Sequence, residues 1–103
     1  MTTVHIENTV RDFDTWKANF DQYERFRAEQ GVRSYRVSRS VTEPDEVLID
    51  LEFCDETAAQ AFLPKLEQIL SSPQAQAQLV RHSVPRLYAV VTERVPSAGA
   101  GRF

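Results

Sequence analysis

The sequence contains a single cysteine, Cys54, so one chain cannot form an internal disulfide. This scarcity is typical of a protein in a reducing compartment, and we expect a cytoplasmic location. Cys54 has no basic neighbour that would activate its thiol, so we expect it to be buried and unreactive. No apolar run approaches the ~20 residues that cross a bilayer. The first residues also lack the basic and apolar regions of a signal peptide. We therefore expect no membrane partner.

A large charge imbalance is also missing. The net charge is −3, from 12 basic and 15 acidic residues, which gives no reason to expect a nucleic-acid partner. The chain has no internal repeat and no linker, and its 103 residues fit one domain. We expect this domain to span residues 1–96 and to be followed by a flexible, Gly-containing tail at 97–103.

What is present is a clear alternation of strand and helix patterns. Every second residue of Val47–Cys54 is apolar (Val47, Ile49, Leu51 and Phe53), and most of these are β-branched or aromatic, a pattern typical of a strand covered on one side. Similar patterns predict strands at 3–9, 32–41 and 85–95. Apolar residues at steps of three and four predict a helix at 13–30, which Gly31 ends, and a second helical region from 56 to 82. Pro64 should kink or split that region near 61–63, and Pro73 should start its last, short helix.

The order of these elements, βαββαβ, is that of a ferredoxin-like α+β fold. We expect an antiparallel four-stranded sheet with both helices on one face, the second helix being split between Pro64 and Pro73. The other face would carry apolar and polar residues together. Two copies of the chain packed face to face would cover it and enclose a cavity of mixed polarity.

Several segments resemble one family of bacterial proteins: Val10–Lys17, Phe20–Asp21, Gly31–Val37, Asp50–Phe53 and Ala61–Leu63. They are similar to the dimeric α+β barrel superfamily, and within it to small antibiotic biosynthesis monooxygenase-like proteins and proteins described as cyclases. The resemblance implies a homodimer with a ligand cavity in each half. Members include cofactor-independent oxygenases of aromatic polyketides, haem-degrading monooxygenases and muconolactone-type isomerases, so the fold does not choose among reactions.

Strand parity predicts which side chains line the cavity. Val4, Ile6, Tyr35, Val37, Ile49, Leu51, Phe53, Leu87, Ala89 and Val91 should face the helices. The other face should carry His5, Glu7, Arg36, Ser38, Leu48, Asp50, Glu52, Tyr88 and Val90. A few polar groups converging in a partly apolar cleft form the usual pattern of a binding site.

The three side chains with the richest chemistry are assigned roles. His5 would be a general base, Arg36 would hold an anionic oxygen of the substrate, and Tyr88 would orient it. The competing interpretation is that Arg36 merely neutralises Asp50 or Glu52 across the hairpin.

No metal or other cofactor is predicted. His5, His82 and the scattered acids lack the spacing of a zinc site, and the haem-degrading pattern is incomplete because its tryptophan is missing. We expect His82 to cap the end of the short helix. Two functions remain open. The chain is either a cofactor-independent monooxygenase or a cyclase/isomerase-like enzyme acting on a small aromatic or enolisable compound, or it is a non-catalytic dimeric module that binds a small molecule or a protein.

Overall fold

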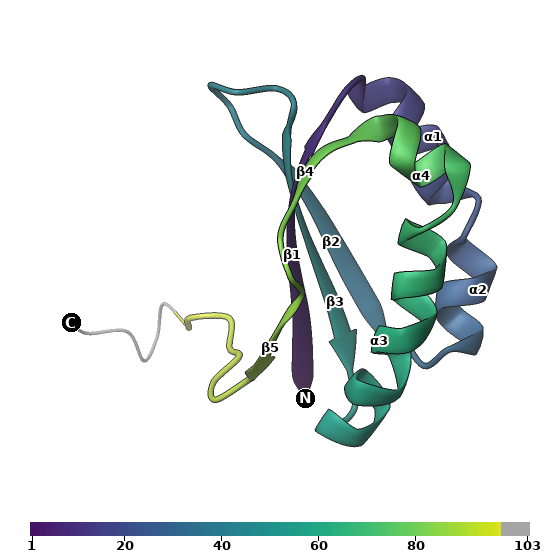
Figure 1. Cartoon of the computed structure of the whole chain (residues 1–103). Helices are drawn as coiled ribbons and strands as arrows, with labels where there is room; N and C mark the ends of the chain where they lie inside the picture. The colour runs from purple at the N-terminus through teal and green to yellow at the C-terminus, as the bar shows by residue number, and fades with distance from the viewer. Residues whose placement is uncertain (98–103) are drawn as a thin grey trace.

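The computed structural model describes residues 1–97, and predictions about residues 98–103 lie outside it. Helices cover one face of a sheet, and the other face is uncovered in the single chain (Figure 1). The elements follow in the order β1 (Thr2–Val10), α1 (Phe13–Asp21), α2 (Glu24–Glu29), β2 (Ser34–Arg39), β3 (Glu46–Phe53), α3 (Glu56–Leu70), α4 (Pro73–Gln78), β4 (Leu79–His82) and β5 (Arg86–Ala89).

The sheet is antiparallel and confirms the predicted α+β ferredoxin-like fold. Its strand order is β2-β3-β1-β4, and β5 also pairs with β1. Two short strands therefore occupy the place of the predicted fourth strand. β5 pairs with Thr2–His5 and β4 with Asn8–Val10, so both lie along the same side of β1. The register shifts between Thr9 and Val10, next to the end of α4.

The predicted helix starts are present, each with a side chain that satisfies a free backbone N–H. Asp12 accepts from the backbone of Thr15 at 3.0 Å, and Asp55 accepts from Ala58 at 2.8 Å. Ser72 begins α4 in the same way. The Asp12 and Asp55 caps fix where the chain leaves β1 and β3 and begins the helices that cross the sheet.

Gly31 ends α2 as predicted. Its φ of +95° is a conformation that side chains with a Cβ disfavour. The turn is closed by two backbone bonds, from Gly31 to the carbonyl of Ala28 and from Val32 to that of Arg27. This pairing is the Schellman arrangement, and it directs the chain into β2.

Three helix predictions need correction. The first helical stretch is broken at Gln22–Tyr23, which separates α1 from α2. α3 continues through Pro64, and the interruption comes at Ser71–Ser72. Residues 79–82 form β4 rather than the end of a helix, so His82 caps no helix.

Two further predictions about exposure and strand length were wrong. The last strand ends at Ala89, and Val91, expected to face the helices, is 93% exposed. Cys54 follows β3 directly and is exposed rather than buried.

The core lies between the sheet and the helices. Val4, Val47 and Phe53 are fully enclosed, and the Phe53 ring lies 5.3 Å from that of Phe62 on α3. Burial alternates along β1 and β3, as the parity of the sequence predicts. Removal of these side chains from water is the main contribution to stability. The alternate residues of each strand lie on the open face.

Candidate functional site

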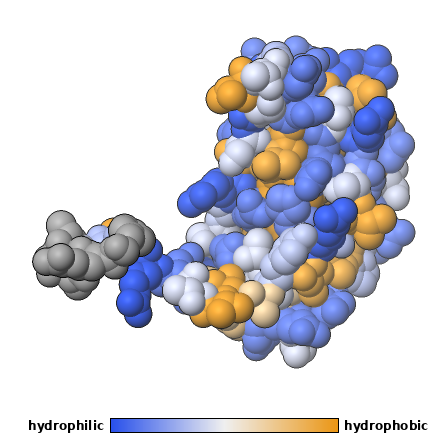
Figure 2. All heavy atoms as spheres, turned by 90° about the vertical axis from the view of Figure 1, so that its left-hand side faces the viewer, coloured by the Kyte–Doolittle hydropathy of each residue, from blue (hydrophilic) through white to orange (hydrophobic). Residues whose placement is uncertain are grey.

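The predicted polar residues do gather on the open face of the sheet. One row crosses four strands in register, formed by Arg36 on β2, Asp50 on β3, His5 on β1 and Arg86 on β5. Apolar side chains lie scattered among polar ones over this face (Figure 2). The face is therefore neither a plain core nor a uniformly charged surface.

His5 is held between two carboxylates. Its Nδ1 donates to Asp50 at 2.6 Å, and its Nε2 lies 3.0 Å from Glu7. Both ring nitrogens donate only when the imidazole is protonated. The hydrogen bond to Asp50 is the largest cause that raises the pKa of His5 above its ordinary value, and the bond to Glu7 adds to it, whereas burial opposes the shift. The arrangement favours a cationic His5.

Arg36 lies opposite Asp50 in the strand register but forms no ion pair with any of residues 1–97. Asp50 is bound to His5 instead, and Glu52 accepts from the hydroxyl of Thr3 at 2.7 Å. Among residues 1–97, Arg36 therefore does not neutralise Asp50 or Glu52, as the competing interpretation would require.

Tyr88 meets His5 edge to face, with ring centroids 6.0 Å apart. Its hydroxyl raises the pKa of Arg86 through a hydrogen bond. Tyr88 is 48% exposed and Leu48, on the same face, 41%. Ser38 lies opposite Leu48, and the backbone of Val90 donates to Met1. Eight of the nine predicted residues thus share one face, which is open to solvent in the single chain, and Val90 follows the end of β5.

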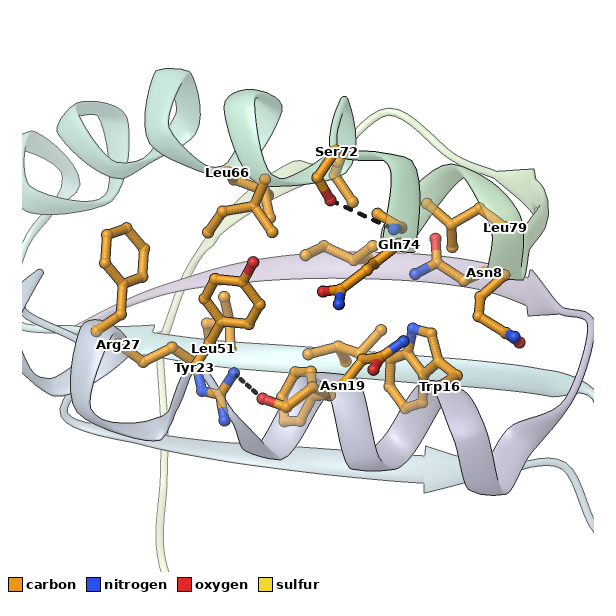
Figure 3. Close-up of a pocket in the computed structure, with 18 of the residues that line it drawn as sticks. Asn8, Trp16, Asn19, Tyr23, Arg27, Leu51, Leu66, Ser72, Gln74 and Leu79 are labelled. Carbon is orange, nitrogen blue, oxygen red and sulfur yellow. Dashed lines mark hydrogen bonds between the residues drawn. The ribbon is translucent and has the colours of Figure 1, made fainter.

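A pocket lies on the other side of the sheet, between α1–α2 and α3–α4 (Figure 3). Its volume is about 100 Å³, less than the roughly 150 Å³ of a cavity that holds benzene in another protein, so a ring ligand would have to widen the pocket or extend beyond it. Most of the wall is apolar or aromatic. The lining consists of Ile6, Asn8, Trp16, Asn19, Phe20, Tyr23, Phe26, Arg27, Ile49, Leu51, Phe62, Leu66, Ile69, Leu70, Ser72, Gln74, Ala75, Gln78 and Leu79.

The polar groups of this pocket are mostly neutral. Asn8 comes from β1, Asn19 from α1 and Gln74 from α4, while Tyr23 stands at the break between α1 and α2. Asn8 is 7% exposed, and its Oδ1 accepts from Nδ1 of His82 at 3.3 Å. No carboxylate and no histidine appears among the lining residues. The pocket offers hydrogen bonds to a neutral ring compound but no strong base.

Arg27 is the one charged residue of the lining. It is 5% exposed, and its guanidinium carbon lies 3.7 Å from the centre of the Phe20 ring. Nη1 donates to the Phe20 carbonyl at 2.8 Å and Nη2 to Glu24 at 3.3 Å. Nε of Arg27 is buried without a hydrogen-bond partner in the described part of the chain. An unpaired donor in such a place is costly and calls for an explanation.

None of the nine predicted site residues lines this pocket. Glu7 and Leu48 instead border a second pocket, of about 390 Å³, that also touches His82. The signal for the helix-side pocket was Asn8, a polar residue at the parity of Val4 and Ile6. Strand parity places this residue on the helix side, where no site was expected.

The antibiotic biosynthesis monooxygenase family matches residues 1–67, which is more than half of the chain. The chain belongs to this family. No match was found among curated proteins.

Several solved structures have the same fold as this chain. SnoaB, a cofactor-independent oxygenase from Streptomyces nogalater, is 15% identical with a TM-score of 0.66, and the alignment covers 93% of this chain and 97% of SnoaB. Two dimeric ferredoxin-like proteins from uncultured marine organisms are also similar. One is 8% identical with a TM-score of 0.65, covering 93% of this chain and 92% of its own. The other is 16% identical with a TM-score of 0.61, covering 90% and 96%.

Residues 1–97 include no helix with the length and hydrophobicity to cross a membrane. The same residues hold no group of three or more His, Cys, Asp or Glu side chains arranged to hold a metal ion.

Proposed function

We propose that this protein is a cofactor-independent monooxygenase that acts on a small aromatic or enolisable compound bound in the helix-side pocket. The observation that carries the proposal is an apolar, aromatic-lined pocket inside a member of the antibiotic biosynthesis monooxygenase family. The structural likeness to SnoaB agrees with it at the level of the fold. The rings of Trp16, Phe20 and Phe26 would pack against a planar ligand.

The reaction needs only a substrate that forms a stabilised carbanion. Loss of a C–H proton next to a carbonyl gives an enolate, which passes one electron to O₂. The resulting radical and superoxide combine to a hydroperoxide, and loss of water leaves a new carbonyl. The balance is R₂CH₂ + O₂ → R₂C=O + H₂O. The pocket's part is to exclude bulk water, to align the ring and to stabilise the enolate.

The open face has a different role in this proposal. We propose that it packs against the same face of a second copy, as the dimeric neighbours suggest. The roles predicted for His5, Arg36 and Tyr88, with Glu7, Ser38, Leu48, Asp50, Glu52 and Val90 as substrate contacts, stay predictions for a cavity between two such faces.

Two alanines of α4 provide a matched test. Ala75 lines the pocket, whereas Ala77 is exposed on the same helix and outside it. O₂ uptake would be measured with a panel of enolisable aryl ketones and phenols. We expect wild type and Ala77→Phe to consume O₂ with at least one compound, and Ala75→Phe to lose that activity because the new ring fills the pocket.

Full activity in Ala75→Phe would show that the pocket is not the site. Activity that is lost in Leu48→Trp but kept in Ala75→Phe would assign the reaction to the open face. Tight binding of the panel without O₂ uptake would make the chain a binding module instead of an enzyme.

A further inference from the structure

The second pocket is larger than the helix-side pocket and lies across the sheet from it. Its volume of about 390 Å³ falls within the roughly 300–1,000 Å³ that is usual for ligand pockets. It stands at one end of the open face, where the last residues of β1 meet the start of β3 and the short strand β4. The pocket has room for a small molecule, and the oxygenation proposed above does not use it.

Two opposite charges flank Thr9 in this pocket. In the strand register, Thr9 lies opposite Glu46 of β3 on one side and opposite Arg81 of β4 on the other. All three residues belong to the lining. Among residues 1–97, Glu46 and Arg81 form no ion pair with each other or with any other side chain. One carboxylate and one guanidinium that bind nothing else in this part of the chain therefore border the same space.

The other acid of the lining, Glu7, already has a partner. Nε2 of His5 lies 3.0 Å from Oε2 of Glu7. The backbone N–H of Glu7 donates to the hydroxyl oxygen of Ser83 at 3.0 Å, which leaves the hydroxyl hydrogen of Ser83 able to donate to a ligand. A ligand of one sign alone would match only Glu46 or only Arg81. A ligand that carries both signs would match the two together.

The pocket also has an apolar part. Leu48 lies opposite Glu7 in the register, lines the pocket and is 41% exposed. An apolar group of a ligand that covers Leu48 removes both surfaces from water, which favours binding. The ligand that fits the lining therefore has an anionic group, a cationic group and an apolar group close together.

We propose that the second pocket binds a free α-amino acid with an apolar side chain. Arg81, helped by the hydroxyl of Ser83, holds the carboxylate, and Glu46 holds the ammonium group. Leu48 contacts the side chain of the ligand. The two pockets share Asn8 alone among their lining residues, so this proposal does not depend on the proposed oxygenation.

The test compares L-leucine with two analogues that each lack one of its charges. 4-Methylpentanoate has no ammonium group, and 3-methylbutylamine has no carboxylate. Titration calorimetry of the wild-type chain at neutral pH measures the three affinities. Glu46 and Arg81 are exposed, so water competes for them, and we expect L-leucine to bind about three- to tenfold more tightly than either analogue. Equal affinities for the three compounds, or no binding of L-leucine at millimolar concentration, would overturn the proposal.

Two variants assign the charges. Arg81→Met should lower the affinity for L-leucine by about the same three- to tenfold and leave that for 3-methylbutylamine unchanged. Glu46→Gln should also weaken L-leucine but leave 4-methylpentanoate unchanged. Glu43→Gln and Arg25→Met are the matched controls, because both residues are exposed and lie outside the lining. An unchanged affinity for L-leucine in Arg81→Met or Glu46→Gln would reject this site.

A last comparison separates the two pockets. Ala75→Phe fills the helix-side pocket and should leave the binding of L-leucine unchanged. Loss of that binding in Ala75→Phe, with the circular dichroism of the wild type retained, would place the ligand in the helix-side pocket and overturn the proposal. Selective binding of L-leucine without O₂ uptake by any compound would end the proposed oxygenation and leave the amino-acid site standing.

Discussion

At the scale of single residues, His5 links the open face to pH. Its side chain is 20% exposed and lies between Asp50 and Glu7. The hydrogen bonds raise its pKa above 6.5 in the folded chain. The folded protein therefore holds this proton more tightly than the unfolded chain does, and protonation of His5 stabilises the fold.

We expect the stabilisation from His5 to be fully present below pH 6.5 and to disappear as the pH rises through the raised folded-state pKa. Urea unfolding of wild type and His5→Gln, compared between about pH 5 and about pH 9, measures it. The difference in unfolding free energy between the two proteins should shrink as pH rises. A difference in unfolding free energy that grows with pH, or one that stays constant, would contradict the expectation that protonated His5 stabilises the fold.

The residues of the helix-side pocket show why the site was harder to predict than the fold. The sequence draws attention to ionisable residues, and those of β1, β3 and β5 do share one face. The pocket instead uses neutral amides, such as Asn19 and Gln74, which look like ordinary surface residues. Arg27 falls within the apolar stripe of the first helical stretch and among nearby acids, so nothing in one sequence shows that its guanidinium is buried.

At the scale of elements, α3 contains Pro64, which was predicted from the sequence to break the helix. Pro64 removes one backbone hydrogen bond and crowds the preceding turn. The helix persists because Ala59, Phe62 and Leu66 are buried against the sheet. Tertiary packing thus outweighs local preference, as it does for most helices in proteins.

Replacement of Pro64 by alanine should stabilise the protein by about 1–3 kcal/mol, because it restores the bond and removes the clash. Pro73 provides the comparison. It stands in the first turn of α4, where proline is favoured, so Pro73→Ala should give no gain. Chemical denaturation of both variants measures the difference. Loss of stability in Pro64→Ala would mean that a bend at Pro64 is needed for α3 to follow the sheet.

The elements that the sequence predicted correctly are those with strong local signals. Asp12, Asp55 and Gly31 mark helix ends through their own chemistry, and the alternation in β1 and β3 survives because one side of each strand is buried. β4 was missed because Leu79–His82 continues a helical spacing, and its strand form depends on pairing with distant β1. The break at Gln22–Tyr23 contains neither glycine nor proline, so it gives no local sign.

At the scale of the whole molecule, the open face is the surface through which we expect two copies to assemble. Leu48 and Tyr88 are large apolar side chains exposed on it, beside the paired charges of His5 and Asp50. A second copy would cover the apolar groups and would offer Arg36 an acceptor that residues 1–97 of its own chain do not supply.

We expect the wild-type chain to be a dimer in solution and Leu48→Glu to shift it to a monomer, because a new acid would be buried beside other acids. Val41→Glu is the control, since Val41 is fully exposed in the loop before β3. Sedimentation velocity over a range of protein concentrations distinguishes the two states. A dimer that persists in Leu48→Glu would place the contact elsewhere.

The outer border of the sheet, formed by β2, bears on how copies of the chain can associate. β2 ends the strand order and leaves its outward backbone groups without a neighbouring strand. Arg33, Arg36 and Arg39 follow this border at every third residue. Three like charges along this border disfavour its pairing with the same border of another molecule. Copies that join through their broad faces would form closed pairs, and we expect the charged border to disfavour side-by-side stacking of such pairs through β2 when the protein is concentrated.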